Sequence, residues 1–245
     1  MERYLNTEFI GRNLEVFDEI DSTNNEAKRS CQFPDGTVFV ARTQTGGKGR
    51  QGRVWVSPKG EGAWFSVLLK PDISPERVSQ ITLIAGLAVS RAIGGKIKYP
   101  NDIVIGTKKV CGILTELVTY NNNYSVVCGI GINVNTQSFD AELATKATSL
   151  LIENGYEHHV EIIVARVLNE FEVLYKEFLQ NGLENIIEEY KYNCITLNSE
   201  VTVTYQNKSL KGTCTDILSD GSIVINNEMV INSGEVSVRG IYGYV

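Results

Sequence analysis

The chain has 245 residues and a net charge of −6, with 42% hydrophobic and 21% charged residues. This composition is ordinary for a soluble globular protein, and the length suffices for one large or two modest domains. The negative balance argues against general nucleic-acid affinity, which requires a broad basic face.

The scattered cysteines form no C-x-x-C pair, so they predict buried thiols in a reducing compartment, with neither disulfides nor a zinc site. They are Cys31, Cys111, Cys128, Cys194 and Cys214. The only histidines, His158 and His159, are adjacent and therefore point in different directions. The N-terminus lacks the apolar core of a signal peptide, and no apolar run approaches the ~20 residues of a membrane span. We expect a cytoplasmic protein with no membrane segment and no metal of its own.

Leu14 to Phe17 is the first expected strand, and a helix follows it from the segment D-S-T-N-N-E at 21–26. Thr23 and Glu26 have the spacing of a capping box. The start of this helix also presents hydroxyls and free N–H groups that can bind a polar ligand. The residues alone leave both interpretations open.

Thr37 to Ala41 predicts a strand that leads into the unusual segment Q-T-G-G-K-G-R-Q-G-R-V-W at 44–55. Glycines bring the backbone close to a ligand, and successive N–H groups can form an anion site that lysine and arginine reinforce. The segment is not a P-loop, because Gly49 stands where a Mg²⁺-binding hydroxyl is required. It is not a dinucleotide fingerprint either, because a strand and not a helix follows.

Further strands are expected at 63–70, 96–99, 103–105, 109–119 and 124–134. Proline at the first position predicts a helix from Ser74–Pro75 to Gly94–Gly95, apolar nearly all round and therefore buried. An i, i+3, i+4 pattern predicts an amphipathic helix over 160–178 that continues over 183–190. Glycines at 129 and 131 within a strand indicate either the close approach of another group or a bulge.

From about Ile195 the chain predicts short β segments separated by turn residues. They lie at 200–205, 209–218, 222–226, 229–231 and 235–239. Closely spaced strands of this kind are typical of a small antiparallel barrel. Because no flexible linker precedes them, we expect the barrel to dock on the larger domain.

The remaining chemistry-bearing features are few. They are the glycine loop, the polar segment Ser22-Thr23-Asn24, the turn Pro100-Asn101-Asp102 and Lys109 beside a glycine. Without an evident catalytic base or metal cluster, this set suits catalysis by positioning and charge neutralisation on a phosphate or carboxylate.

These features resemble the blocks of the biotin protein ligases, in the same order over about residues 21–239. The loop 44–58 resembles their G-R-G-R-x-G-R-x-W signature, and K-Y-P-N-D at 98–102 their K-W-P-N-D box. The segment K-V-C-G-I-L-T-E at 109–116 is similar to K-x-x-G-I-L-x-E, and G-I-G-I-N-V-N at 129–135 to the G-x-G-x-N-V strand. Segments 147–150 and 234–239 resemble later blocks.

The resemblance implies an α+β fold with a mixed, largely antiparallel sheet and packed helices. It implies a class II synthetase-like catalytic domain over 1–192 and an SH3-like barrel over 193–245. It also implies a two-step reaction, in which biotin and Mg-ATP give biotinyl-5′-AMP and a lysine of a biotin carboxyl carrier protein then takes the biotin.

By the same resemblance, Lys109, Arg50 and Asp102 carry the chemistry, with Lys109 bridging the two anions and Asp102 near the incoming amine. The implied biotin-binding residues are Ser22, Thr23, Asn24, Gln44, Gly47, Lys48, Gly49, Arg50, Lys109, Gly112 and Gly129. The implied ATP-binding residues are Arg50, Arg53, Trp55, Asn101, Lys109, Asn133 and Arg239. No metal ligand is implied.

Three positions depart from the family pattern. Lys48 replaces an arginine and loses its planar fork, Tyr99 replaces a tryptophan, and Cys111 stands at a position that is usually small. The motifs begin at Asp21, which leaves no room for the DNA-binding domain of some relatives, so we expect no operator binding. A homodimer through sheet edges is a modest expectation.

Two other functions stay open. A lipoate ligase or octanoyltransferase shares the catalytic fold, although the biotin-type glycine loop and the C-terminal barrel disfavour it. A nucleic-acid-binding module would use the basic loop and the small barrel, but the net charge opposes it.

Overall fold

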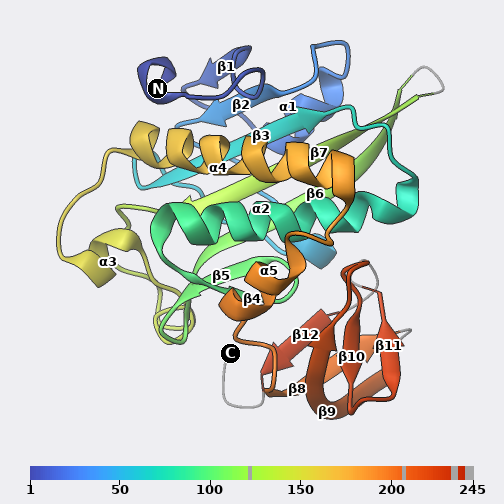
Figure 1. Cartoon of the computed structure of the whole chain (residues 1–245). Coiled ribbons are helices and arrows are strands. Elements are labelled where there is room, and N and C mark those ends of the chain that lie inside the picture. The colour runs from blue at the N-terminus through green and yellow to red at the C-terminus, as the bar shows by residue number, and fades with distance from the viewer. Residues whose placement is uncertain (121–122, 206–207, 233–236, 241–245) are drawn as a thin grey trace.

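A seven-stranded mixed sheet forms the centre of the computed structural model, with a smaller antiparallel sheet beside it (Figure 1). The structure describes residues 1–120, 123–205, 208–232 and 237–240. The strand order of the large sheet is β1-β2-β3-β7-β6-β5-β4, in which β1 and β2 run parallel and the remaining neighbours antiparallel. The predicted α+β fold with packed helices is confirmed.

The strands of this sheet are β1 (Leu14–Phe17), β2 (Thr37–Ala41), β3 (Gly62–Leu69), β4 (Lys96–Lys98), β5 (Asp102–Ile105), β6 (Lys108–Tyr120) and β7 (Asn123–Asn133). The α-helices are α1 (Thr23–Arg29), α2 (Val78–Ile93), α3 (Leu150–Asn154), α4 (Val160–Asn181) and α5 (Ile187–Asn193). Short 3-10 turns lie at Glu2–Tyr4, Arg50–Gly52 and Pro75–Arg77. The sequence thus predicted most elements to within a few residues.

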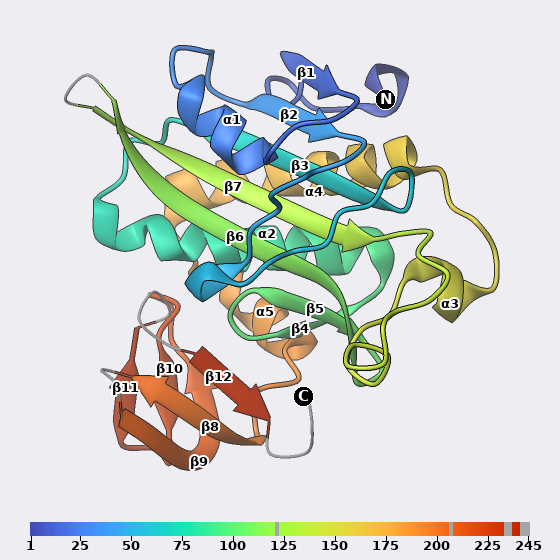
Figure 2. The same cartoon turned by 180° about the vertical axis from the view of Figure 1, so that it is seen from behind.

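Helices α2 and α4 cover one face of the sheet (Figure 1), while α1 and the loop after β2 lie on the other (Figure 2). Strand β3 is therefore buried along its whole length. Its side chains alternate between the two faces: Phe65 and Val67 belong to the core under α2 and α4, whereas Leu68 packs in the smaller core with Ala27 of α1. The loop face is the one on which the candidate site lies.

The capping box predicted at the start of α1 is wrong. Ser22 is the N-cap, and no side chain makes a capping hydrogen bond there. The Thr23 hydroxyl instead donates to Gln44 Oε1 at 3.2 Å, because the glycine loop lies directly beside this helix end. Thr23 and Glu26 have the spacing of a capping box, but the Thr23 hydroxyl bonds to the distant Gln44 instead of to the helix backbone.

The N-terminal segment is held on α4 by the buried carboxylate of Glu172. The backbone N–H groups of Phe9 and Ile10 donate to it at 3.0 and 2.8 Å, and that of Glu8 donates as well. Burial raises the pKa of Glu172, but these three donors outweigh it and the net shift is downward. The carboxylate therefore stays charged inside the fold.

The second sheet has the strand order β11-β10-β9-β8-β12 and is antiparallel throughout. Its strands are β8 (Glu200–Tyr205), β9 (Lys208–Ile217), β10 (Ile223–Ile225), β11 (Met229–Ile231) and β12 (Ser237–Gly240). The part of the last predicted segment at 235–236 lies outside the described residues.

The second sheet docks beside β4 and α5 (Figures 1 and 2). The Tyr99 hydroxyl donates to the carbonyl of Gly221 at 3.0 Å, and Gln80 Nε2 donates to the carbonyl of Asp220 at 2.8 Å. Gly221 has φ +85°, and a Cβ there would stand 2.6 Å from Leu83 of α2. Docking of these segments on the larger part of the chain is therefore confirmed.

Over the described residues, no helix is both long and apolar enough to cross a membrane.

Candidate active site

A cavity of about 680 Å³ opens on the loop face of the large sheet. Its walls come from the start of α1, the glycine loop, strands β5, β6 and β7, and Val238 of β12. The predicted residues that line it are Ser22, Thr23, Asn24, Gln44, Lys48, Gly49, Arg50, Arg53, Trp55, Asn101, Asp102, Lys109, Gly112, Gly129 and Asn133. The fold thus brings together almost all residues that the sequence motifs indicated.

Two predicted residues stand apart from this group. Gly47 is absent from the cavity lining, and a Cβ on it would meet the Trp55 carbonyl at 2.3 Å and the Ser57 hydroxyl at 2.9 Å. It therefore serves the packing of the loop on itself. The backbone of Arg239 lies in β12, opposite Thr202, but its side chain is outside the described part of the structure.

One end of the cavity is polar but carries few charges. Gln44 Oε1 accepts hydrogen bonds from the backbone N–H and the hydroxyl of Thr23, at 2.9 and 3.2 Å, and Gln44 Nε2 donates to the Ser57 hydroxyl at 2.8 Å. The buried hydroxyl of Ser66 lies 2.7 Å from that of Thr23 and 2.6 Å from Asn24 Oδ1. These contacts fix donors and acceptors of neutral groups in place.

Three glycines leave the sheet without side chains beneath the loop. Gly112 of β6 lies opposite Gly131 of β7, and Gly129 lies two residues along the same face. A Cβ on Gly129 would be 1.9 Å from Asn24 Oδ1, and one on Gly131 would be 2.5 Å from Trp55 Nε1. The β3–β7 and β6–β7 registers run through these positions without a shift. The sequence left open whether these glycines mark a bulge or the close approach of another group. The structure shows close approach, by the side chains of Asn24 and Trp55.

The Trp55 indole lies over this glycine floor. The Trp55 ring makes an edge contact with Trp64, with 6.4 Å between the ring centroids. Lys109 Nζ stands 5.1 Å from the centroid of the Trp55 ring. Trp55 Nε1 is buried without a hydrogen-bond partner in the described part of the chain. A buried N–H of this kind gains free energy from any acceptor that a ligand brings.

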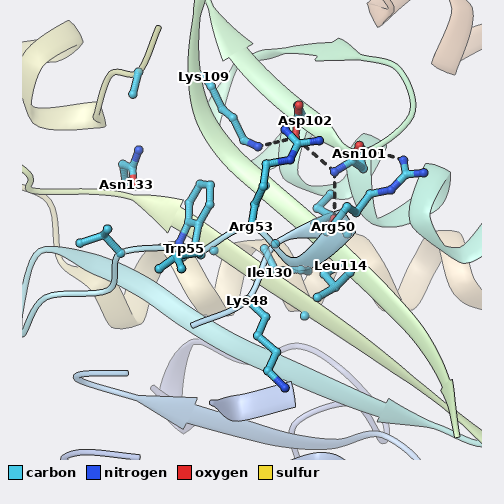
Figure 3. Close-up of a pocket in the computed structure, with 18 of the residues that line it drawn as sticks. Lys48, Arg50, Arg53, Trp55, Asn101, Asp102, Lys109, Leu114, Ile130 and Asn133 are labelled. Carbon is cyan, nitrogen blue, oxygen red and sulfur yellow. Dashed lines mark hydrogen bonds and ion pairs between the residues drawn. The ribbon is translucent and has the colours of Figure 1, made fainter. Parts of the chain in front are cut away.

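The other end of the cavity is strongly charged. Lys109 Nζ is 2.6 Å from Asp102 Oδ1, and Lys98 Nζ is 3.8 Å from Asp102 Oδ2. Arg50 Nη1 donates to Asn101 Oδ1 at 3.2 Å (Figure 3). Two lysines thus contact one carboxylate and Arg50 adds a third positive charge nearby, which leaves a surplus of positive charge for an anionic ligand.

Burial lowers the pKa of Arg50, and the charge of Asp102 opposes that shift. Arginine remains protonated in proteins because its unperturbed pKa exceeds 12. A guanidinium that has already lost part of its hydration interacts more strongly with an incoming anion than an exposed one does. Arg50 is therefore better prepared to bind a phosphate than the exposed Arg53, which donates to Gln51 at 3.3 Å.

The Lys48 side chain points away from the other cations of the site (Figure 3). Its Nζ donates to Asn25 Oδ1 of α1 at 2.9 Å. Although Lys48 borders the cavity, its ammonium joins the loop to α1. The lysine in place of the usual arginine thus has a role in holding the loop.

Sequence reasoning missed Lys98, Ser66 and Ser57 as members of this site. Lys98 belongs to the K-Y-P-N-D segment, and neither that segment nor the strand Lys96–Lys98, which holds a second lysine, indicated its contact with Asp102. Ser66 is the one polar residue in the buried segment A-W-F-S-V-L-L, which pointed to a polar contact. Nothing in the local pattern distinguished Ser57 from other loop serines.

Cys111 is fully buried, and burial raises the pKa of its thiol far above the usual value. The prediction of a small buried residue is therefore confirmed. Within the described residues, no three or more His, Cys, Asp or Glu side chains are grouped so that they could hold a metal ion.

Fold and site together define a class of protein that binds an anionic substrate under a glycine loop. The chain belongs to the biotin/lipoate A/B protein ligase family, whose model matches residues 16–133. It is 35% identical over 235 residues to the bifunctional ligase/repressor BirA of Bacillus spizizenii, covering 91% of this chain and 72% of that protein. The predicted resemblance to this family is confirmed.

Two further relatives match over nearly their whole length. The biotin–[acetyl-CoA-carboxylase] ligase of Mycobacterium tuberculosis is 29% identical over 257 residues, with 96% of this chain and 94% of that protein covered. The solved structure of the Aquifex aeolicus biotin protein ligase in complex with biotin and ATP superposes with a TM-score of 0.85 at 31% identity. That superposition covers 94% of this chain and 99% of the other.

Proposed function

We propose that this protein is a biotin protein ligase. It forms biotinyl-5′-AMP and pyrophosphate from biotin and Mg-ATP, and then transfers the biotinyl group to a lysine of a biotin carboxyl carrier protein. The observation that carries this proposal is a single cavity with a neutral hydrogen-bonding end and a cationic end. Biotin has the matching shape, with a neutral ureido ring at one end and a carboxylate at the other.

The neutral end receives the ureido group. Ser22, Thr23, Asn24 and Gln44 offer donors and acceptors there, and Ser66 and Ser57 keep those side chains in their rotamers. The glycine floor lets Asn24 lie against the sheet at Gly129, and Trp55 and Lys109 at Gly112. A neutral polar group gains specificity from fixed partners, because a mismatched ligand leaves them unpaired in a buried site.

Lys109 acts where the two anions meet. The biotin carboxylate must approach the α-phosphate of ATP, and two unit charges 4 Å apart repel by about 4 kcal/mol at an effective dielectric constant of 20. Lys109 lines the cavity beside Trp55 and can neutralise both groups, while Arg50 binds phosphate oxygens. When Lys109 turns toward the substrates, its contact with Asp102 is exchanged for contacts with them.

Asp102 serves the second step. After pyrophosphate leaves, the carrier lysine attacks the carbonyl of the mixed anhydride, and the carbonyl–phosphate bond breaks to release AMP. Asp102 orients the incoming amine and accepts its proton. The loop residues Lys48 and Gly49 cover the adenylate and keep water from it.

The nucleotide occupies the remainder of the cavity. Arg53 and Asn101 face the phosphates, and Trp55 and Asn133 face the ribose and base. We assign Arg239 to the same site because its neighbour Val238 lines the cavity. Mg²⁺ enters as part of the Mg-ATP substrate.

We further propose that residues 1–192 form the catalytic domain, of class II synthetase type, and that residues 193–245 form an SH3-like barrel. The five-stranded antiparallel sheet supports the second assignment. We place the protein in the cytoplasm, where its carrier substrate and ATP occur, and assign it no DNA target. For a homodimer, the candidate edge is β6 beyond Gly112, where β7 is its only partner among the described strands.

The alternative is lipoate or octanoate transfer by the same fold. The decisive experiment incubates the protein with labelled ATP and either biotin or lipoate and resolves the acyl-AMP formed. Biotinyl-AMP, followed by labelling of a carrier protein, supports the proposal, whereas lipoyl-AMP without biotinyl-AMP refutes it.

The same assay tests the role of Lys109. We expect Lys109→Ala to lower biotinyl-AMP formation by at least about 100-fold, as removal of a transition-state donor does elsewhere. Lys108→Ala is the matched control, because it removes a neighbouring lysine of the same strand that does not line the cavity. Adenylation at the wild-type rate in Lys109→Ala would refute the assignment.

A further inference from the structure

Lys98 lies between the second sheet and the carboxylate of the candidate site. It is the last residue of β4 and is only 6% exposed. Its Nζ donates to the backbone carbonyl of Val238 in β12 at 3.2 Å, and it stands 3.8 Å from Asp102 Oδ2. One ammonium therefore contacts both parts of the molecule.

A buried ammonium is costly unless its hydrogens are bonded and its charge is compensated. The Val238 carbonyl and the Asp102 carboxylate provide both conditions from opposite parts of the chain. The carbonyl is a backbone atom of a paired strand, since Val238 lies opposite Val203 in the β8–β12 ladder. The position of Lys98 is thus determined by the docked sheet.

Asp102 has two lysine neighbours with different exposure. Lys109 is the nearer, at 2.6 Å, and its side chain is 19% exposed, whereas that of Lys98 is 8% exposed. Lys109 has the freedom to turn toward a ligand in the cavity. Lys98 is held by β12, and it therefore stays beside Asp102 when Lys109 leaves.

We propose that Lys98 is a positioning residue for Asp102 in the transfer step, and that β12 completes the site by fixing Lys98. This inference rests on the proposed function, because it assigns the effect to the second of its two half-reactions. During adenylation Lys109 engages the substrate anions and Asp102 is a bystander. During transfer, Lys98 stays beside the Asp102 carboxylate and keeps it directed at the incoming amine.

The test measures the two half-reactions separately in the full-length protein. Pyrophosphate release with biotin and ATP reports the first, and a single turnover from bound biotinyl-AMP to a biotin carboxyl carrier domain reports the second. We expect Lys98→Met to slow transfer by on the order of 10- to 100-fold, as misplacement of a catalytic group does. Adenylation should change by less than about threefold, and the KM for biotin should stay the same.

Lys98→Arg should recover part of the transfer rate because it retains the charge. Lys96→Met is the matched control: Lys96 lies two residues earlier on β4, donates to Asn193 of α5 at 2.9 Å and does not line the cavity. It should leave both half-reactions unchanged. If Lys98→Met does not fold, the comparison of Lys98→Arg with the wild type still separates the two steps.

An equal loss in both half-reactions, or an unaffected transfer rate, overturns the inference and leaves Lys98 a structural residue. A wild-type protein that makes no biotinyl-AMP refutes the proposed function instead. In that case a crystal structure of Lys98→Met decides about Lys98: the inference requires that the Asp102 carboxylate shift toward Lys109, and an unmoved carboxylate contradicts it.

Discussion

Gly129→Ala tests directly whether the glycine floor positions the ligand-binding side chains. The added Cβ would stand 1.9 Å from Asn24 Oδ1 and 2.7 Å from Asn24 Cγ, a separation that no real structure tolerates. Asn24 must therefore leave its place. It would give up hydrogen bonds with the Ser66 hydroxyl at 2.6 Å, the Leu114 carbonyl at 3.2 Å and Glu116 Oε2 at 2.8 Å.

Each of these hydrogen bonds contributes about 0.5–1.5 kcal/mol, so the free energy of unfolding should fall by about 1.5–4.5 kcal/mol. In a protein of this size each kcal/mol lowers the Tm by about 2–4 °C. If Asn24 also binds biotin, as proposed, the loss of one such contact weakens binding by about tenfold per 1.4 kcal/mol. Stability and affinity should therefore decrease together.

Thermal unfolding and calorimetric titration with biotin measure the two effects. The control is Gly86→Ala in α2, where the added Cβ meets no atom closer than 4.0 Å and alanine favours the helix. It should leave biotin affinity unchanged and stability equal or higher. A Gly129→Ala protein with wild-type affinity and Tm would refute the reasoning about the floor.

Three other variants examine the loop and the core. Arg50→Gly should release biotinyl-AMP faster in a chase experiment, since the half-buried guanidinium no longer holds the loop; an unchanged off-rate contradicts a lid. Lys48→Met removes the exposed bond to Asn25 and should raise that off-rate by only about two- to fivefold, as such contacts contribute up to about 1 kcal/mol. A larger change would assign Lys48 to the ligand. The lowered pKa of Glu172 stabilises the fold above the usual pKa of about 4.3, and this contribution is lost as the pH falls. Glu172→Gln should therefore reduce stability at pH 7 and flatten its decline in acid, as denaturant titrations at several pH values will measure; an equally steep decline would exclude Glu172 as a cause.

Most elements were predictable because their signals are local. The all-round apolar pattern of α2 required burial, and the left-handed Gly94 ended that helix. Short β segments separated by turn residues predicted the antiparallel strands near the C-terminus. The capping box failed for the complementary reason. Thr23 has the spacing of a capping box, but its hydroxyl donates to Gln44, which lies 21 positions further along the chain.

The candidate site shows the same division more sharply. Sequence alone indicated the glycine loop, Lys109 and the polar start of α1, because motif order and residue type are properties of the chain. Tertiary structure decided that Gly112 and Gly131 lie opposite each other, that Lys48 turns to Asn25, and that Lys98 joins β12 to Asp102. Strand register and the docking of one sheet on another are interactions between distant residues, and no local pattern encodes them.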